Sequence, residues 1–325
     1  MSGASAGAPS RPAATATGAV LLMAYGSPRD RADILPYYTH MRGGRPPTPE
    51  AMAELERRYQ AIGGRSPLTE ITFAQASALR SVLQREYGSR WDVVVGMKHN
   101  HPFLEEAVAE LCSRGVDRVI ALTLAPHYSA MSIAGYVQRV RTAAAALDNP
   151  PEFAFIEDWH LHPGYISWLA DQVRGQLDAL GPARAADALV VFSAHSLPAR
   201  LREMGDPYPD QLGETAAAVA ARLGLSQWTT GWQSVARSAG EPWLGPELLE
   251  VVQMEAGRGR RDFIVCACGF VADHLEVLFD LDVEAQAEAD RLQVTIRRTA
   301  MPNDDPAFVR GVLADLVGQE IRRRD

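Results

Sequence analysis

The stretch 263–284, FIVCACGFVADHLEVLFDLDVE, carries three carboxylates at a regular spacing. Glu276, Asp280 and Glu284 are four residues apart, so they lie along one face of a helix, for which Asp273 is the expected N-cap. Like charges at this spacing repel each other, and solvent, Arg or Lys partners, or a metal cation must compensate them. A solvated acidic face is the ordinary explanation. However, the opposite positions are apolar and the row begins just past a predicted strand, where open α/β sheets bind ligands. The pattern therefore also predicts a path for a divalent metal.

His195 is the second candidate, because it follows the apolar run 188–193 and is expected at the carboxyl end of a strand. Its neighbours Ala194 and Ser196 are small, so little bulk shields the imidazole. Histidine exchanges a proton near neutral pH and also binds borderline metals such as Fe²⁺. A hydrogen-bonded structural histidine at the rim of the sheet is the alternative at this position.

Tyr25 holds the corresponding place in the first half of the chain. It follows the apolar run 19–24, and on position alone it could equally be a tyrosine that packs at the edge of a sheet.

The glycine loop 63–68, GGRSPL, is close in sequence to several arginines. Such a loop and its arginines together suit carboxylates or phosphates, although loop arginines are often only solvated. Lys98, His99 and His101, after another predicted strand, are weaker candidates for contacts with anionic substrate groups.

The chain lacks the motifs of several common enzyme classes. It has no G-x-S-x-G elbow, no G-x-G-x-x-G turn and no Walker loop, which disfavours a hydrolase triad, dinucleotide binding and NTP chemistry. The net charge of -8 and a pI near 5.5 argue against nucleic acid as the main partner. No run of eighteen apolar residues is present, so we expect no transmembrane segment.

The three cysteines, Cys112, Cys266 and Cys268, do not form a disulfide framework and fit a reducing cytoplasm. Cys266 and Cys268 are expected to point to the same face of a strand. A metal or cluster site usually needs four ligands, and no second cysteine pair follows. We therefore expect small core residues here rather than metal ligands.

The predicted fold class is α/β, with two similar Rossmann-like domains, each a parallel sheet flanked by helices, and a cleft between them. Strand patterns alternate with helical patterns of ten to fifteen residues in both halves of the chain. Because polar clusters follow the strands, His195 and Tyr25 should line the cleft from opposite sides. The expected divisions are a disordered tail over 1–17, an N-terminal domain over 18–160, a C-terminal domain over 161–303, and a C-terminal helix over 304–325 that packs back on the N-terminal domain.

Eleven motifs in the same order make the sequence resemble the ferrochelatase family, and above all the monofunctional coproporphyrin III ferrochelatases of Gram-positive bacteria. The resemblance covers residues 18 to 316. Its motifs are LLMAYGSP (21–28), YYTHMRGGRPP (37–47), RYQAIGGRSPL (58–68), GMKHNHPF (96–103), LAPHYS (124–129), FSAHSLP (192–198), GDPYPDQL (205–212), GWQS (231–234), EPWLGP (241–246), GFVADHLEVLFDLD (269–282) and MPN (301–303).

This resemblance implies roles for individual residues. His195 and Glu276 match the catalytic pair, which accepts pyrrole protons or binds incoming iron. Asp280 and Glu284 match an acidic iron path or second divalent site, on a helix that the family winds partly as a π-helix. Tyr25 matches a tyrosine that binds the iron of the product. The implied substrate contacts are Tyr25, Arg42, Arg58, Ser66 and Tyr136.

The implied activity is that of a lyase of heme biosynthesis, which inserts Fe²⁺ into coproporphyrin III, releases two pyrrole protons and gives coproheme. The resemblance further implies a cytoplasmic monomer that hands its product to a downstream heme-pathway enzyme. Such an enzyme binds no nucleic acid. Apart from a regulatory divalent ion, it needs no cofactor beyond the substrate Fe²⁺.

Two positions depart from the family pattern. Gly43 replaces a frequent basic residue, which weakens one propionate contact, and Cys266-Ala267-Cys268 replaces an apolar run that contains proline. Relatives that bind a [2Fe–2S] cluster use additional cysteines, so we expect no cluster here. The alternatives are a protoporphyrin IX ferrochelatase, a cobalt or nickel chelatase, and a non-catalytic tetrapyrrole-binding or heme-delivery protein.

Overall fold

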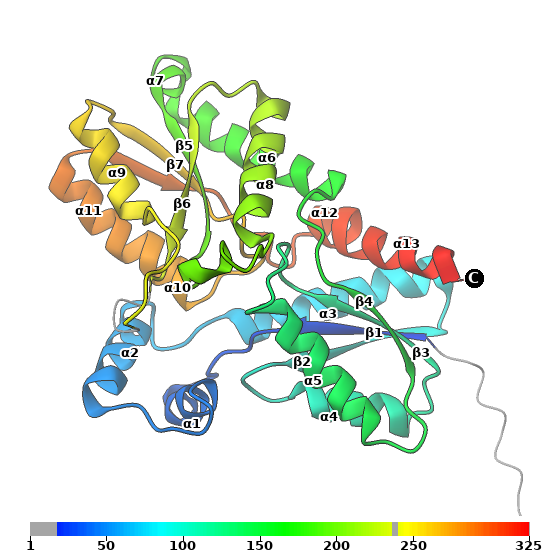
Figure 1. Ribbon diagram of the computed structural model, residues 1–325. Coiled ribbons are helices and arrows are strands. Elements are labelled where there is room, and N and C mark those ends of the chain that lie inside the picture. Colours follow the sequence, from blue (N-terminus) through cyan, green and yellow to red (C-terminus); the bar gives the residue numbers. More distant parts are fainter. Residues whose placement is uncertain (1–17, 236–239, 325) are drawn as a thin grey trace, which may run out of the picture.

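Two four-stranded parallel sheets form the framework of the protein (Figure 1). The computed structural model describes residues 18–235 and 240–324, so the predicted tail over 1–17 lies outside the described residues. The strand orders are β2-β1-β3-β4 and β6-β5-β7-β8. The strands are β1 (Gly18–Ala24), β2 (Trp91–Met97), β3 (Arg118–Thr123), β4 (Glu152–Ile156), β5 (Leu189–His195), β6 (Trp228–Gln233), β7 (Asp262–Cys266) and β8 (Thr295–Arg298). The predicted fold class is confirmed.

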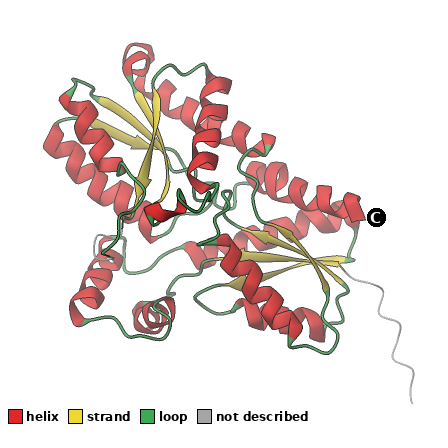
Figure 2. Ribbon diagram, viewed as in Figure 1, coloured by secondary structure: helices red, strands yellow, loops and turns green. Residues whose placement is uncertain are grey.

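Helices cover both faces of each sheet (Figure 2). The first half contains α1 (Arg31–Met41), α2 (Pro49–Ala61), α3 (Leu68–Tyr87), α4 (Leu104–Ser113) and α5 (Ile133–Ala145). The second half contains α6 (Pro163–Leu180), α7 (Pro182–Asp187), the 3₁₀ turn η1 (Ala199–Leu201), α8 (Tyr208–Leu223), α9 (Leu248–Gly257), α10 (Leu275–Phe279), the π-helical turn η2 (Asp280–Glu284) and α11 (Ala285–Leu292).

Burial on both faces explains why the central strands are continuously apolar. In β1, Val20 and Leu22 pack in one hydrophobic cluster, whereas Leu21 and Met23 pack in another on the opposite face. Successive side chains of a strand point to opposite faces, so a strand covered by helices on both sides needs apolar residues at every position.

The helix α1 was not predicted, because it lacks the periodicity on which such predictions depend. Ile34 is its only buried residue, and Pro36 lies inside it. Asp30 caps the helix instead, since its side chain accepts hydrogen bonds from the N–H groups of Ala32 and Asp33. A helix with so little buried surface gives no apolar stripe for sequence analysis to detect.

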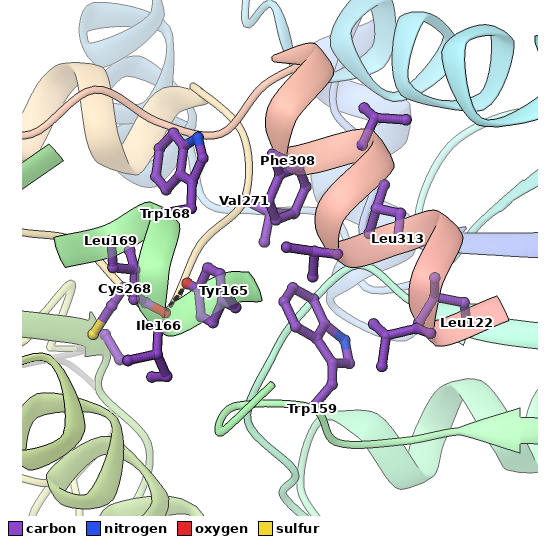
Figure 3. Packing of buried hydrophobic residues seen from close by; sticks show 14 of the residues in the cluster. Leu122, Trp159, Tyr165, Ile166, Trp168, Leu169, Cys268, Val271, Phe308 and Leu313 are labelled. Carbon is purple, nitrogen blue, oxygen red and sulfur yellow. Dashed lines mark hydrogen bonds between the residues drawn. The ribbon is translucent and has the colours of Figure 1, made fainter. Parts of the chain in front are cut away.

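The two halves share one hydrophobic cluster, in which residues distant in sequence interdigitate (Figure 3). The rings of Trp159 and Tyr165 are 5.0 Å apart, and the rings of Tyr165 and Phe308 are 6.3 Å apart. Trp159 Nε1 donates to the carbonyl of Thr123 at 3.0 Å, and the Tyr165 hydroxyl donates to the carbonyl of Cys268 at 2.7 Å. Trp159 and Tyr165 therefore each hydrogen-bond their polar atom to a backbone carbonyl, because an unpaired polar atom in the core would cost free energy.

The end of the chain returns to the first half. A continuous helical run, α12 (Pro306–Phe308), the π-helical turn η3 (Val309–Ala314) and α13 (Asp315–Arg324), packs against α3 and α6. A C-terminal helix was predicted over 304–325, and the helical run occupies Pro306–Arg324. In its last turn Arg324 pairs with Glu320 at 2.6 Å and with Glu152 at 2.7 Å, contacts that an apolar pattern does not reveal. None of the helices in the described part of the chain is long and apolar enough to cross a bilayer.

Gly164, in the first turn of α6, is where this returning segment comes closest to the backbone. A Cβ atom at this position would lie 2.2 Å from the carbonyl oxygen of Gly311 in η3. The obstacle is backbone rather than a flexible side chain, so α6 and η3 would have to separate to admit even one methyl group.

We therefore expect Gly164→Ala to lower the free energy of unfolding by about 1–3 kcal/mol, the usual cost of overpacking a close contact. Gly175→Ala is the matched control, because Gly175 lies in the same helix with nothing within 4 Å of its added Cβ. That control should be neutral or stabilising by up to about 1 kcal/mol through helix propensity. Urea unfolding of both variants measures the difference, and equal stabilities would contradict this account of the contact.

Candidate active site

A pocket of about 470 Å³ lies at the carboxyl ends of the strands, and residues from both halves line it. Five of the nine predicted site residues are in its wall. Tyr25, Ser66 and Tyr136 come from the first half, and His195 and Glu276 come from the second. The expectation that His195 and Tyr25 line one cleft from opposite sides agrees with this geometry.

The imidazole of His195 is held in a defined orientation. His195 is the last residue of β5, which lies between β6 and β7, and the Tyr208 hydroxyl donates to its carbonyl oxygen at 2.9 Å. On the ring, Nδ1 contacts the carbonyl oxygen of Ser196, so Nδ1 must carry a proton and donate it there. Nε2 is consequently the atom that faces Glu276.

His195 and Glu276 form an ion pair, with Nε2 and Oε1 3.5 Å apart. About a third of each side chain, 32% and 33%, remains open to the pocket. Burial alone would lower the pKa of His195, but the Glu276 carboxylate raises it to about 9. Burial alone would likewise raise the pKa of Glu276, and the charge of His195 with hydrogen bonds from His195 and His274 holds that pKa below its usual range. At neutral pH the pair is thus an imidazolium and a carboxylate that together carry one proton.

The prediction that Asp273 caps the acidic helix is wrong. The N-cap of α10 is His274, whose backbone is extended and whose Nε2 is 3.8 Å from the second oxygen of Glu276. Asp273 instead accepts from the Asn303 side-chain amide at 2.7 Å and pairs with Arg298 at 3.2 Å. These partners come from the end of the chain, so the sequence around Asp273 could not indicate them.

The second acid of the row, Asp280, opens the π-helical turn η2, which agrees with the π-helix that the family resemblance implies. Asp280 Oδ2 accepts from the Ser234 hydroxyl at 2.6 Å. Burial and the negative charge of Glu276 raise the pKa of Asp280 to about 7. Neither Asp280 nor Glu284 lines the pocket itself. The acids therefore lie behind the ion pair, outside the pocket wall.

Two arginines of α2 face this acidic turn. The guanidinium carbons of Arg57 and Arg58 lie 5.2 and 5.0 Å from the centre of the Phe279 ring, a cation–π geometry. The charge of Arg58 acts on Asp280, and that of Arg57 interacts with Glu284. Arginine partners thus compensate part of the acidic charge. Among the residues that the structure describes, no three His, Cys, Asp or Glu side chains are grouped closely enough to hold a metal ion.

The opposite wall presents Tyr25, whose side chain is 41% exposed. Its ring lies 4.6 Å from the ring of His99, and Nδ1 of His99 is 3.0 Å from Nδ1 of His40. Burial, followed by the charge of Lys98, lowers the pKa of His99 to about 3, so this imidazole is neutral. Burial and Glu276 raise the pKa of Tyr25, so its phenol is protonated at neutral pH.

The two predicted arginines lie outside the pocket wall. Arg42 stacks over the Tyr38 ring, Arg58 bonds Glu54 at 2.9 Å, and neither lines the pocket. Lys98, to which the sequence gave less weight, does line it. Its Nζ lies 4.9 Å from the centre of the Tyr136 ring. The signal for Lys98 was its place directly after a predicted strand.

Several pocket-lining residues were given no role from the sequence, among them Tyr208, Trp243 and His274. His274 had a local signal, since it stands two residues before Glu276 and just before the helix. Tyr208 and Trp243 stand in the motifs GDPYPDQL and EPWLGP, but nothing near them in the sequence marked them as pocket residues. They reach the pocket from loops and helix starts whose course depends on tertiary packing.

Cys266 ends β7, and Cys268 lies two residues beyond it. Both are free thiols in the shared hydrophobic cluster, as expected for small core residues. Burial, with the neighbouring Cys266, raises the pKa of the Cys268 thiol, so the thiol stays protonated.

Solved structures of chelatases share the fold. The sirohydrochlorin chelatase SirB from Bacillus subtilis subspecies spizizenii, in complex with cobalt, superposes with a TM-score of 0.56 at 9% identity, covering 91% of this chain and 92% of that one. SirB from Bacillus subtilis with Fe³⁺ gives 0.54 at 12% identity, covering 93% of this chain and 98% of that one. At such low identity the likeness concerns the fold alone.

Sequence comparison is more specific. The coproporphyrin III ferrochelatase of Anoxybacillus flavithermus is 40% identical over 306 residues, which is 94% of this chain and 96% of the relative. A ferrochelatase of Herpetosiphon aurantiacus is 40% identical over 302 residues, which is 93% of this chain and 98% of the relative. The family model described as Ferrochelatase matches residues 17–321. This chain therefore belongs to the ferrochelatase family.

Proposed function

We propose that this protein inserts Fe²⁺ into coproporphyrin III, giving coproheme and releasing two pyrrole protons. The observation that carries the proposal is one pocket in which the His195–Glu276 pair faces the wall that holds Tyr25. The membership in the ferrochelatase family and the relatives named coproporphyrin III ferrochelatase support the reaction and its substrate.

The chemistry requires a flat macrocycle to pucker and to lose two protons while it is held between two walls. At neutral pH the His195–Glu276 pair already carries one proton, and the lowered pKa of Glu276 keeps its carboxylate ionised beside the imidazolium. An approaching Fe²⁺ places positive charge beside the imidazolium, which lowers the pKa of His195 and releases its proton to the solvent. The neutral imidazole of His195 then accepts a pyrrole proton or binds the arriving metal.

We assign the route of Fe²⁺ to the acidic row behind this pair. Ser234 and Asp280 share a 2.6 Å hydrogen bond, and Asp280 and Glu276 interact electrostatically. Carboxylate oxygens suit a hard or borderline divalent ion. Glu284 extends the row, either as part of this path or as a second, regulatory divalent site. On the other wall, Tyr25 is the proposed ligand of the product iron.

The propionates of the substrate need donors around the pocket. Lys98, Ser66 and Tyr136 line it, and Arg42 and Arg58 are proposed to reach the outer propionates from α1 and α2. Coproporphyrin III has four propionates and protoporphyrin IX has two, so this number of donors favours coproporphyrin. The Gly43 position supplies no side chain for this purpose.

The remaining properties follow the family resemblance. We propose a monomer in the cytoplasm that passes coproheme to a downstream heme-pathway enzyme and carries no [2Fe–2S] cluster. We also propose domains that divide near residue 160, with the segment 304–325 as an arm on the first domain.

Anaerobic Fe²⁺ insertion into coproporphyrin III and protoporphyrin IX, followed side by side by absorbance, tests the activity. We expect kcat/KM for coproporphyrin to be at least about tenfold higher, since one charge-assisted hydrogen bond contributes about 1.5 kcal/mol or more. A preference for protoporphyrin would overturn the substrate assignment. Inactivity with both porphyrins would favour the non-catalytic binding protein.

His195→Ala should reduce kcat by at least about 10²-fold, because it removes both a proton acceptor and a metal ligand. Porphyrin binding, measured by fluorescence quenching, should persist, since the rest of the pocket is unchanged. His101→Ala is the matched control, because His101 is exposed and pairs with Glu106 outside the pocket. Near-normal turnover of His195→Ala would remove His195 from the mechanism.

Glu276→Gln should lower the pKa of His195, because the carboxylate is what raises that pKa to about 9 against the effect of burial. NMR titration of the His195 ring in the substrate-free protein should give a midpoint near 9 in the wild type. In the variant it should move well down, toward the ordinary value of about 6.5. Glu288→Gln, which breaks a surface pair with Arg291, should leave the midpoint unchanged. Identical midpoints in wild type and Glu276→Gln would show that the ion pair does not form.

A further inference from the structure

Asp206 is a buried carboxylate in the GDPYPDQL segment and has no part in the proposed chemistry. Its side chain is 8% exposed and both of its oxygens are used. Oδ2 accepts from the backbone N–H of Ala130 at 2.7 Å and from the Ser129 hydroxyl at 3.1 Å. Oδ1 accepts from the backbone N–H of Tyr208 at 3.0 Å. A carboxylate makes such bonds stronger than a neutral acceptor does.

These bonds join the two halves of the molecule. Ser129 and Ala130 lie in the loop that follows β3 of the first sheet, whereas Asp206 and Tyr208 lie at the start of α8 in the second half (Figure 1). Two neutral contacts run in parallel, from the Tyr128 N–H to Gln211 Oε1 at 2.7 Å and between the His127 ring and Thr215 at 2.9 Å. Among these contacts Asp206 supplies the only charged acceptor.

Each end of this connection leads directly to a wall of the pocket. On one side, the loop runs on through Met131 and Ile133 into α5, which carries Tyr136, and all three line the pocket. On the other side, Tyr208 lines the pocket and donates its hydroxyl proton to the carbonyl oxygen of His195. A displacement at Asp206 would therefore change the position of α5 relative to the catalytic histidine.

We propose that Asp206 is a positioning residue, which sets the spacing between the α5 wall and the His195 wall of the pocket. The proposal rests on the proposed function, since it assigns to this spacing the distortion of the bound porphyrin. Two walls at a set separation can bend a flat macrocycle toward the geometry that receives the metal, and misplacement by a fraction of an ångström costs rate rather than binding.

Asp206→Asn tests this with little change of shape. An asparagine has one carbonyl oxygen, so it cannot accept from Tyr208 on one side and from Ser129 and Ala130 on the other. Asp210→Asn is the matched control, because Asp210 carries the same charge in the first turn of the same helix and is exposed. Ser129→Ala removes one of the three donors and leaves the carboxylate in place.

The first readout, amide hydrogen exchange of residues 128–136 in the substrate-free protein, does not depend on any activity. We expect exchange to be at least about tenfold faster in Asp206→Asn, intermediate in Ser129→Ala and unchanged in Asp210→Asn. If the wild type inserts no metal, the proposed function fails, and this readout still decides whether Asp206 ties the walls together. If Asp206→Asn does not fold, Ser129→Ala decides it instead.

The second readout concerns the porphyrin. In Asp206→Asn, kcat for Fe²⁺ insertion should fall at least about tenfold while KM for coproporphyrin changes less than about threefold. The out-of-plane resonance Raman bands of bound, metal-free porphyrin should weaken in parallel, which a general loss of stability would not produce. Unchanged exchange in Asp206→Asn, or faster exchange with unchanged kcat and Raman bands, would overturn the proposal.

Discussion

The hydrophobic cluster that the two halves share is the constraint on which the pocket depends. Trp159, Tyr165 and Phe308 pack together although they come from the linker, α6 and the end of the chain. Because this contact is buried and close-packed, it resists small sliding movements. The two sheets therefore meet at a set distance, with the carboxyl ends of their strands on the same pocket. Gly164 contributes to the same packing, because its missing side chain lets η3 lie close against α6.

Burial and neighbouring charges together set the protonation states of the ionisable groups in and beside the pocket. The same carboxylate, Glu276, raises the pKa of His195 to about 9 and that of Asp280 to about 7. One neighbour is thereby held in its charged form, and the other is poised between its two forms near neutral pH. Arg57 and Arg58 balance the far end of the acidic row.

Much of the framework could be predicted because its signals are local. The apolar runs 19–24 and 188–193 form the strands β1 and β5, since such runs act within a few positions. The glycine loop 63–68 leads directly into α3, which begins at Leu68, and Ser66 Oγ accepts the Leu68 N–H. The C-terminal helix continues to Arg324, which pairs with Glu320 and with the distant Glu152.

The sequence by itself determined which groups can do the chemistry, because strand ends in parallel sheets must meet at one edge. That rule placed Tyr25 and His195 each at the carboxyl edge of its own sheet, and the packing of the two halves brought both edges to one pocket. Only the tertiary structure decided how these groups are used. The proton count of the His195–Glu276 pair depends on a 3.5 Å separation and on burial. The tie between Asp206 and Ala130 joins residues 76 positions apart. Such effects depend on distances and desolvation, and a linear pattern carries neither.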